Sequence, residues 1–262
     1  MNPKISIATI NDIARAAGRA ILEVYHHADF SRVVNFKDDD SPLTLADQAA
    51  HRVIAPALQQ HYPDIPLISE EGKDVPYATR REWEYFWLVD PLDGTKEFIK
   101  RNGQFTVNIA LIHHHRPVLG VIYTPVTEEM YFSAQAGYAE DIEPGTYKRT
   151  GNGAGEQLHV RKPSGERVAV RSSSHASEEE DAVLEKYRVT ESIARGSSLK
   201  FCMVAEGKAD IYYRHGPTME WDTAAGQAIV EAAGGEMFQE TSDRPFTYNK
   251  ESLRNGSFLV LT

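Results

Sequence analysis

The stretch Trp87-Leu88-Val89-Asp90-Pro91-Leu92-Asp93-Gly94-Thr95 runs from an apolar segment into a turn that carries two carboxylates. The apolar run from Tyr85 to Val89 is aromatic and β-branched, which predicts a short buried strand. Pro91 keeps the preceding aspartate out of helical backbone geometry. Gly94 can take backbone angles that other residues resist, so the chain can turn sharply there. The strand therefore delivers Asp90 and Asp93 together at its carboxyl end.

These two carboxylates and the Leu92 carbonyl group between them suit a divalent cation. Carboxylates so close together repel one another unless a cation neutralises them. Mg²⁺ prefers oxygen ligands of this kind and is usually held by a few carboxylates together with phosphate and water. The alternative is that Asp90 and Asp93 only accept hydrogen bonds from backbone amides of the turn. The turn alone leaves both interpretations open.

Length and charge limit the class of protein. A chain of 262 residues, 41% hydrophobic and 25% charged, suits one large globular domain or two modest ones. Its formal net charge of -10 argues against binding to nucleic acid polymers, which needs a basic surface. A phosphate-bearing ligand would therefore have to be held by local cations or metal ions.

The expected location is the cytoplasm. The single cysteine, Cys202, cannot form an internal disulfide and is expected to be a small buried side chain in a reducing compartment. The first residues lack the apolar core of a signal peptide. We also find no apolar run near the roughly 20 residues that a membrane span needs, so we expect no transmembrane segment.

Two helices and a strand are expected before the central turn. Apolar residues at helical spacing through Val24 predict a first amphipathic helix that ends near His26 and His27. The segment Thr44-Leu45-Ala46-Asp47 has the pattern of a capping box, so a second helix is expected to start there. Asp47 is then either an ordinary helix-start acid or a site residue. The stretch Pro66 to Gly72 predicts a strand that ends in Glu70 and Glu71.

An antiparallel sheet is expected after the central turn, from strands at 105–113 and 118–123 and a third near Tyr131. The histidines at 113–115 fall in the turn between the first two strands. Adjacent residues cannot all converge on one ion, so a metal site made of these histidines is disfavoured. Residues 140–155 are expected to form a long turn or domain boundary. We predict an α+β metal-binding part over 1–155 and an α/β part over 156–262.

The second part alternates strand and helix patterns, which indicates an α/β unit. The stretch from Val170 to His175 ends a strand with hydroxyls, a cation and a histidine. The stretch from Gly196 to Lys200 opens a helix whose free N–H groups suit an anion. Both could hold phosphate. The alternatives are that Ser197 caps the helix and that Lys200 and Arg214 are solvated surface cations.

A third acidic motif, Trp221-Asp222-Thr223-Ala224-Ala225-Gly226, opens a further helix through Ala233. Asp222 is well placed to be the N-cap of this helix, and this purely structural role is the alternative to a role in a site. The small residues that follow permit very close packing. A buried site could hold one carboxylate in position in this way.

Taken together in this order and spacing, the three motifs at 70–72, 90–95 and 221–226 resemble the lithium-sensitive, magnesium-dependent phosphomonoesterases of the inositol monophosphatase superfamily. The resemblance covers almost the whole chain and implies a layered α/β/α/β/α sugar-phosphatase fold. Within this superfamily, the stretches Lys96–Ile99 and Gly196–Cys202 are similar to those of bacterial 3'(2'),5'-bisphosphate nucleotidases.

The resemblance also implies the site. Two or three Mg²⁺ ions would bind to Glu70, Asp90, the Leu92 carbonyl, Asp93 and Asp222. Glu70 and Thr95 would activate water, with Asp47 orienting Thr95. The implied substrate contacts are Glu70, Leu92, Asp93, Gly94, Thr95, His175, Ser197, Lys200, Arg214 and Asp222.

The activity implied is hydrolysis of the 3'-phosphate of 3'-phosphoadenosine 5'-phosphate, or of its 5'-phosphosulfate relative, in sulfur assimilation. The products would be AMP, or adenosine 5'-phosphosulfate, and phosphate. An inositol monophosphatase, another sugar phosphatase and a non-catalytic metal or nucleotide sensor are the alternatives. A monomer is expected. Bacterial relatives are regarded as peripheral to the cytoplasmic face of the inner membrane, although no basic amphipathic helix that would cause this is visible here.

Overall fold

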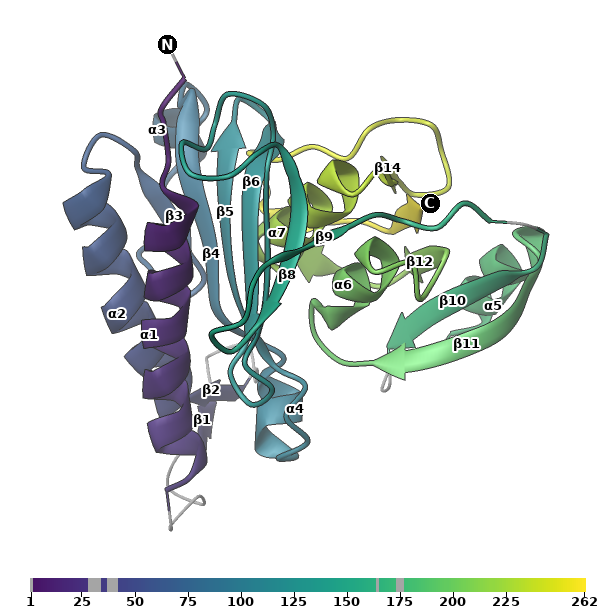
Figure 1. Cartoon of the computed structure of the whole chain (residues 1–262), viewed down its shortest axis with the longest axis horizontal. Helices are drawn as coiled ribbons and strands as arrows, with labels where there is room; N and C mark the ends of the chain where they lie inside the picture. The colour runs from purple at the N-terminus through teal and green to yellow at the C-terminus, as the bar shows by residue number, and fades with distance from the viewer. Residues whose placement is uncertain (1, 28–33, 37–41, 164, 173–176) are drawn as a thin grey trace.

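The predicted layered α/β/α/β/α fold is confirmed by the computed structural model, which describes residues 2–27, 34–36, 42–163, 165–172 and 177–262. A seven-stranded sheet and a five-stranded sheet form the two β layers. Figure 1 shows one helical layer outside the first sheet, a second between the sheets and α5 beside the second sheet. The three layers are, in turn, α1 (Ile7–Tyr25) with α2 (Leu45–His61), α6 (Leu199–Ala205) with α7 (Glu220–Ala232), and α5 (Glu178–Lys186).

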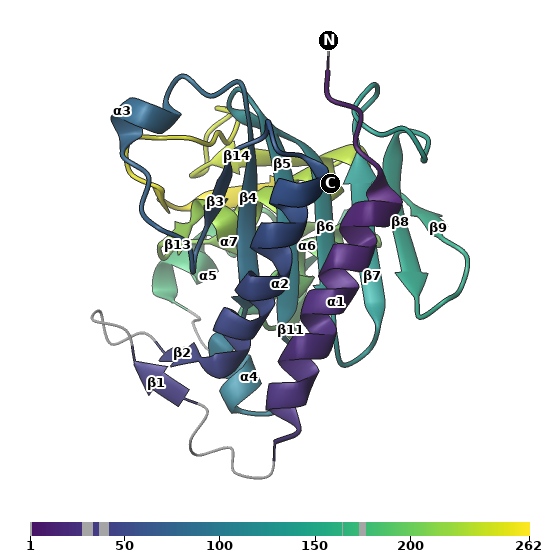
Figure 2. The same cartoon turned by 90° about the vertical axis from the view of Figure 1, so that its left-hand side faces the viewer.

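The two long N-terminal helices form as their sequence pattern predicts. α1 begins after Ser6, whose side chain accepts a hydrogen bond from the Thr9 N–H, the usual contact of an N-cap. Its apolar side chains face the sheet and are buried, including Ile10 and Ile21. Figure 2 shows α1 and α2 lying side by side over the first sheet. Both helix predictions are confirmed within a few residues.

The seven-stranded sheet carries the central turn on its second strand. Its order is β3-β4-β5-β6-β7-β8-β9; β3 and β4 are parallel, and the other neighbours are antiparallel. Helices cover both faces of β4, which explains its continuous apolar run. The strands are β3 (Leu67–Ser69), β4 (Tyr85–Asp93), β5 (Thr106–His113), β6 (Arg116–Thr124), β7 (Glu129–Ala134), β8 (Gly145–Thr150) and β9 (Glu156–Leu158).

Two sequence expectations about this sheet were wrong. The central strand does not end at Val89 but continues to Asp93, with a shift of register between Asp90 and Asp93. Residues 140–155 are not one long turn, because β8 lies within them and pairs with β7 and β9. Partners elsewhere in the chain supply these hydrogen bonds, so local composition does not reveal them. The sheet runs on to Leu158, just past the predicted domain boundary, which stays a prediction.

The second sheet contains both parallel and antiparallel pairs, and the sequence reasoning missed its strands β11, β14 and β16. Its order is β11-β10-β12-β16-β14. In the described ranges, no helix is long and apolar enough to cross a bilayer. The strands are β10 (Arg167–Ser172), β11 (Val189–Arg195), β12 (Ile211–Arg214), β14 (Glu236–Gln239) and β16 (Phe258–Leu261).

The remaining elements are short. Four small strands form two-stranded pairs, β1 with β2 and β13 with β15. Two single-turn helices, α3 and α4, flank β4 along the chain. Their bounds are β1 (Val34–Phe36), β2 (Pro42–Thr44), α3 (Tyr77–Arg80), α4 (Thr95–Ile99), β13 (Thr218–Met219) and β15 (Arg254–Asn255).

The helix α7 lies unusually close to the first sheet because a glycine faces it. A Cβ atom on Gly120 of β6 would lie 2.6 Å from the Ala225 carbonyl oxygen and 2.8 Å from the Ala228 Cβ. The predicted close packing of the Ala-Ala-Gly segment is therefore confirmed. Since α7 also carries Asp222, this contact sets the depth at which that carboxylate enters the molecule.

Gly120→Ala should lower the free energy of unfolding by about 1–3 kcal/mol, because the new methyl group would meet the backbone of a helix, which cannot rotate aside. Urea denaturation measures the change. Gly256→Ala is the matched control, since nothing lies within 4 Å of a Cβ built there. Equal stability of the two variants would contradict the close contact.

Candidate active site

The turn after β4 buries Asp90 and uses one of its oxygens locally. Asp90 is 2% exposed, and its Oδ1 accepts a hydrogen bond of 3.0 Å from the Leu92 N–H. Gly94 follows with φ of 91°, in the left-handed region that favours glycine, and α4 begins directly after it. The alternative that Asp90 accepts a hydrogen bond from a backbone amide of the turn is thus correct for one of its two oxygens. Among the residues that the structure describes, none forms a hydrogen bond with Asp90 Oδ2, which is therefore open to another ligand.

Four further acidic residues surround Asp90, and together the five form an acidic cluster. Burial raises the pKa of Asp90, and the charges of Glu70, Asp93, Asp222 and Asp47 raise it further. The parallel pairing of β3 with β4 explains part of this, since the Glu70 N–H donates to the Val89 carbonyl at 3.1 Å. Carboxylates whose charges raise the pKa of a buried neighbour form a set of oxygen donors that a divalent cation would neutralise. The set therefore fits a divalent metal ion.

Asp47 and Thr95 meet although they lie on different helices. Asp47 sits in the first turn of α2 and is only 2% exposed. The Thr95 hydroxyl, at the start of α4, lies 3.5 Å from Asp47 Oδ1, a long hydrogen bond in which the hydroxyl donates. Asp47 is therefore a helix-start acid that also reaches a second helix. This contact supports the predicted role of Asp47 in orienting Thr95.

Asp93 is held by two serine hydroxyls from the other half of the chain. Ser197 and Ser198 donate to Asp93 Oδ2 at 2.7 and 2.6 Å. The alternative that Ser197 caps α6 was wrong, because Ser198 occupies the N-cap position and Ser197 has a positive φ of 55°. Asn108 on β5 donates in turn to Ser198 Oγ at 2.9 Å.

Sequence reasoning did not identify Ser198 or Asn108, and the sequence offers only a weak signal for them. The Ser-Ser pair was interpreted as a helix start, and Asn108 lies within an apolar strand pattern. A buried asparagine in such a strand is the one local hint, because it needs a hydrogen-bond partner.

Asp222 enters the cluster from α7. The alternative that Asp222 is the N-cap was wrong, since Met219 is the N-cap and Asp222 occupies the third helical position. From there Asp222 Oδ2 accepts a hydrogen bond of 2.7 Å from the Met219 N–H. Burial raises the pKa of Asp222, and the charges of Asp93 and Glu70 add to this effect. The acid at this position caps the helix and still contributes to the acidic cluster.

A pocket of about 180 Å³ is lined by two of these acids, Asp93 and Asp222, and by three cations, Lys96, Lys200 and Arg214. Lys200 is 7% exposed, and burial lowers its pKa to about 8, opposed by the charge of Asp93. Its Nζ donates to the Ser197 carbonyl at 2.7 Å. The alternative that Lys200 is a solvated surface cation was therefore wrong. The lining includes the predicted residues Asp93, Gly94, Ser197, Lys200, Arg214 and Asp222.

Other predicted residues lie around this pocket or beyond the described part of the chain. Arg214 ends β12, and within the described ranges its side chain makes no hydrogen bond or ion pair, so it can receive an anion. Glu70 lines a neighbouring pocket of about 140 Å³ together with Trp221. His175, a predicted substrate contact, lies outside the described residues.

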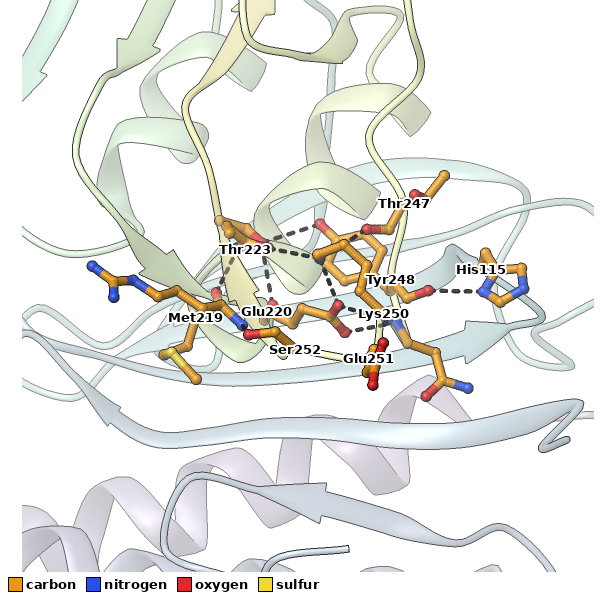
Figure 3. A network of polar contacts seen from close by, with 12 residues as sticks. His115, Met219, Glu220, Thr223, Thr247, Tyr248, Lys250, Glu251 and Ser252 are labelled. Carbon is orange, nitrogen blue, oxygen red and sulfur yellow. Dashed lines mark hydrogen bonds and ion pairs between the residues drawn. The ribbon is translucent and has the colours of Figure 1, made fainter. Parts of the chain in front are cut away.

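The start of α7 is locked by a buried ionic network that sequence reasoning missed. Glu220 is fully buried and accepts hydrogen bonds from the Asn249 N–H at 2.7 Å, the Lys250 N–H at 3.1 Å and Lys250 Nζ at 2.6 Å. Figure 3 shows Lys250 reaching Glu220 beside Tyr248. Arg80 holds the same segment from the other side, donating to the Lys250 carbonyl at 2.7 Å. The network fixes the helix two residues before Asp222.

Glu220→Gln should lower the free energy of unfolding by about 2 kcal/mol, because Lys250 would keep its charge without a carboxylate opposite it. The loss is smaller than for a fully buried pair, since the Lys250 side chain is 34% exposed. Glu240→Gln is the matched control, because Glu240 pairs with Arg244 at 3.8 Å with both side chains about two-thirds exposed. There urea denaturation should show a change below about 0.5 kcal/mol. A similar decrease in the free energy of unfolding of both variants would contradict the proposal that the Glu220 network fixes the start of α7.

Comparison with known proteins agrees with this geometry. Residues 5–258 match the model of the inositol monophosphatase family. The chain belongs to the inositol monophosphatase family, and the predicted resemblance is confirmed.

Two bacterial CysQ proteins are among the similar relatives. The 3'(2'),5'-bisphosphate nucleotidase CysQ of Escherichia coli strain K12 is 48% identical over 250 residues, which cover 95% of this chain and 96% of that protein. The crystal structure of CysQ from Bacteroides thetaiotaomicron has a TM-score of 0.83 at 43% identity and covers 97% of each chain. An inositol monophosphatase from Anabaena, with a TM-score of 0.71 and 22% identity over 97% of this chain and 89% of that one, shares the fold.

Proposed function

We propose that this chain is a metal-dependent 3'(2'),5'-bisphosphate nucleotidase that hydrolyses the 3'-phosphate of 3'-phosphoadenosine 5'-phosphate to AMP and phosphate. One observation carries the proposal: a single pocket places Asp93 and Asp222 of the acidic cluster beside Lys200 and Arg214. A substrate with two phosphate groups suits such a pocket, one group at the acids with their metal ions and the other at the cations. The names of the two CysQ relatives support the same activity.

The acidic cluster would hold the metal. Its donors are oxygens only, which favours Mg²⁺ over softer ions, and two or three ions are proposed. Bound there, Mg²⁺ would make a water molecule more acidic and neutralise charge on the phosphate oxygens. The proposed ligands are Glu70, Asp90, the Leu92 carbonyl, Asp93 and Asp222.

The remaining residues of the site would position the reactants. Thr95 would accept a hydrogen bond from the attacking water, because its hydroxyl donates its own hydrogen to Asp47, and Asp47 would in this way fix the orientation of that hydroxyl. Glu70 would take up the proton that the water loses, and the leaving 3'-oxygen would take up a proton from solvent water as its bond to phosphorus breaks. Ser197 and Ser198 would hold Asp93 in place through their hydrogen bonds. No side chain has to become a covalent nucleophile in this scheme.

The cations would select the substrate. The chain is acidic overall, so a second phosphate needs local positive charge, and Lys200 and Arg214 supply it within the pocket. An inositol monophosphate has no second phosphate group to which these two side chains could bind. The pair therefore distinguishes a bisphosphate nucleotidase from other phosphatases with the same acidic cluster.

The test is phosphate release from 3'-phosphoadenosine 5'-phosphate and from inositol 1-phosphate, measured in Mg²⁺ with and without Li⁺. A strong preference for the nucleotide that Li⁺ suppresses is the expected result. A preference for the inositol ester would leave the metal site in place but refute the role of the two cations. Absence of release from both would favour a binding protein without catalytic activity.

The lowered pKa of Lys200 predicts a pH dependence. Because this pKa is about 8, the side chain loses its charge as the pH rises through that value. The ratio of kcat/KM for the bisphosphate to kcat/KM for 3'-AMP should fall roughly 10-fold between about pH 7 and pH 9.5, since one charge-assisted hydrogen bond to the 5'-phosphate is lost. The ratio removes pH effects common to both substrates.

Lys200→Met should give a low ratio that no longer changes with pH. Lys162→Met, which alters an exposed lysine, is the matched control and should behave as the unchanged protein. A ratio that still falls with pH in Lys200→Met would show that another group reads the 5'-phosphate.

Several finer parts of the assignment stay predictions. These are the choice between the bisphosphate and its 5'-phosphosulfate relative, the number of metal ions, the monomeric state, and a cytoplasmic location with contact at the inner membrane. The buried Cys202 is consistent with a reducing compartment.

A further inference from the structure

A second group of metal-binding side chains lies at the opposite end of β4 from the acidic cluster. Glu84 precedes the first residue of β4, and His113 and His114 lie at the end of β5 and the turn after it. One ligand atom from each of the three lies within 4.8 Å of the others. Asp90 is six residues along the strand from Glu84, or about 20 Å at 3.3 Å per residue. The group is therefore separate from the active site.

The backbone holds the three residues together. Tyr85 and His113 are paired in the ladder between β4 and β5, which fixes both strand ends. Beyond this pair, the His114 N–H donates to the Glu84 carbonyl at 2.7 Å. The side chains of Glu84 and His114 therefore start from neighbouring, hydrogen-bonded positions and need no loop closure to meet.

The ring of His113 is oriented from several sides. It is stacked on Tyr85, with ring centres 4.3 Å apart and planes 3° from parallel, and on His114, also at 4.3 Å. Its Nδ1 forms a hydrogen bond of 2.6 Å with the hydroxyl of Tyr138, which is 9% exposed. When Nδ1–H donates in this bond, the lone pair of Nε2 faces Glu84 Oε1 at 3.5 Å. A second partner on the other ring nitrogen is typical of histidines that bind metals.

We propose that Glu84, His113 and His114 form a surface site for Zn²⁺. A tetrahedral ion with bonds of about 2.0–2.1 Å places its ligand atoms about 3.3 Å apart, close to the distance between His113 Nε2 and Glu84 Oε1. Two imidazoles and one carboxylate favour Zn²⁺ over Mg²⁺, which prefers the oxygen donors of the active site. Three protein ligands leave the fourth position for water.

The sequence argument against a site made of three adjacent histidines is consistent with this proposal. His115 turns away from the cluster, and its Nδ1 contacts the Tyr248 carbonyl at 2.8 Å, as Figure 3 shows. Glu84 takes the third place, and its position 29 residues earlier in the chain hid it from a reading of the histidine run. Bound Zn²⁺ would tie the start of β4 to the hairpin between β5 and β6 and stabilise the folded protein.

The test is isothermal titration calorimetry of Zn²⁺ into the full chain, in millimolar Mg²⁺ so that the acidic cluster is occupied. The unchanged protein should bind Zn²⁺ at this site, and the binding should be lost in Glu84→Gln and His114→Asn. Asparagine suits position 114, because His114 has a positive φ of 53° and asparagine tolerates that conformation. Both variants should therefore fold.

Two further variants sharpen the result. Tyr138→Phe removes the second partner of His113 and should weaken Zn²⁺ binding by about 10-fold. His159→Asn, which changes an exposed histidine outside the cluster, should leave binding unchanged. Zn²⁺ should raise the melting temperature of the unchanged protein and of His159→Asn, and not that of Glu84→Gln. Absence of Zn²⁺ binding to the unchanged protein, or binding by Glu84→Gln and His114→Asn as tight as that of the unchanged protein, would overturn the proposal.

Discussion

The mutual repulsion of buried carboxylates is the constraint on which the site depends. Burial raises the pKa of Asp90 and of Asp222, and the charges of Glu70 and Asp93 raise both further. Hydrogen bonds hold the acids in spite of this repulsion: Leu92 N–H to Asp90, Met219 N–H to Asp222 and two serine hydroxyls to Asp93. A cluster held in this way is preorganised for cations, because little rearrangement is needed when they bind.

The scaffold is arranged to keep these charges together. β3 lies parallel to β4, so the acids that end both strands meet at one edge of the sheet. α7 approaches the same sheet from the other half of the chain, and Gly120 permits the short distance. The Glu220 network then fixes the first turn of α7 against the segment at 249–251. The acidic site is thus shared between the two halves of the chain, and neither sheet holds it alone.

Charge of the opposite sign defines the rest of the pocket. Lys200 is buried among aromatic and polar side chains, and its ammonium lies 5.4 Å from the centre of the Tyr212 ring. Burial makes this charge costly, as its lowered pKa shows, and the nearby acids offset only part of the cost. A phosphate group would supply the missing negative charge. The pocket therefore couples a region that needs cations to a region that needs an anion, which suits a substrate with two phosphates bound together with metal ions.

The sequence by itself determined the elements with local signals: α1 and α7 from helical spacing, the apolar strand before Asp90, and the turn at Gly94. Its three acidic motifs also indicated the family and the residues of the acidic cluster. Only the tertiary structure decided that Ser198 holds Asp93, that Lys200 is buried, that β8 joins the first sheet, and that Glu84 meets two histidines. These features depend on contacts between residues far apart in the chain, and such contacts leave no periodicity or turn chemistry in the local sequence.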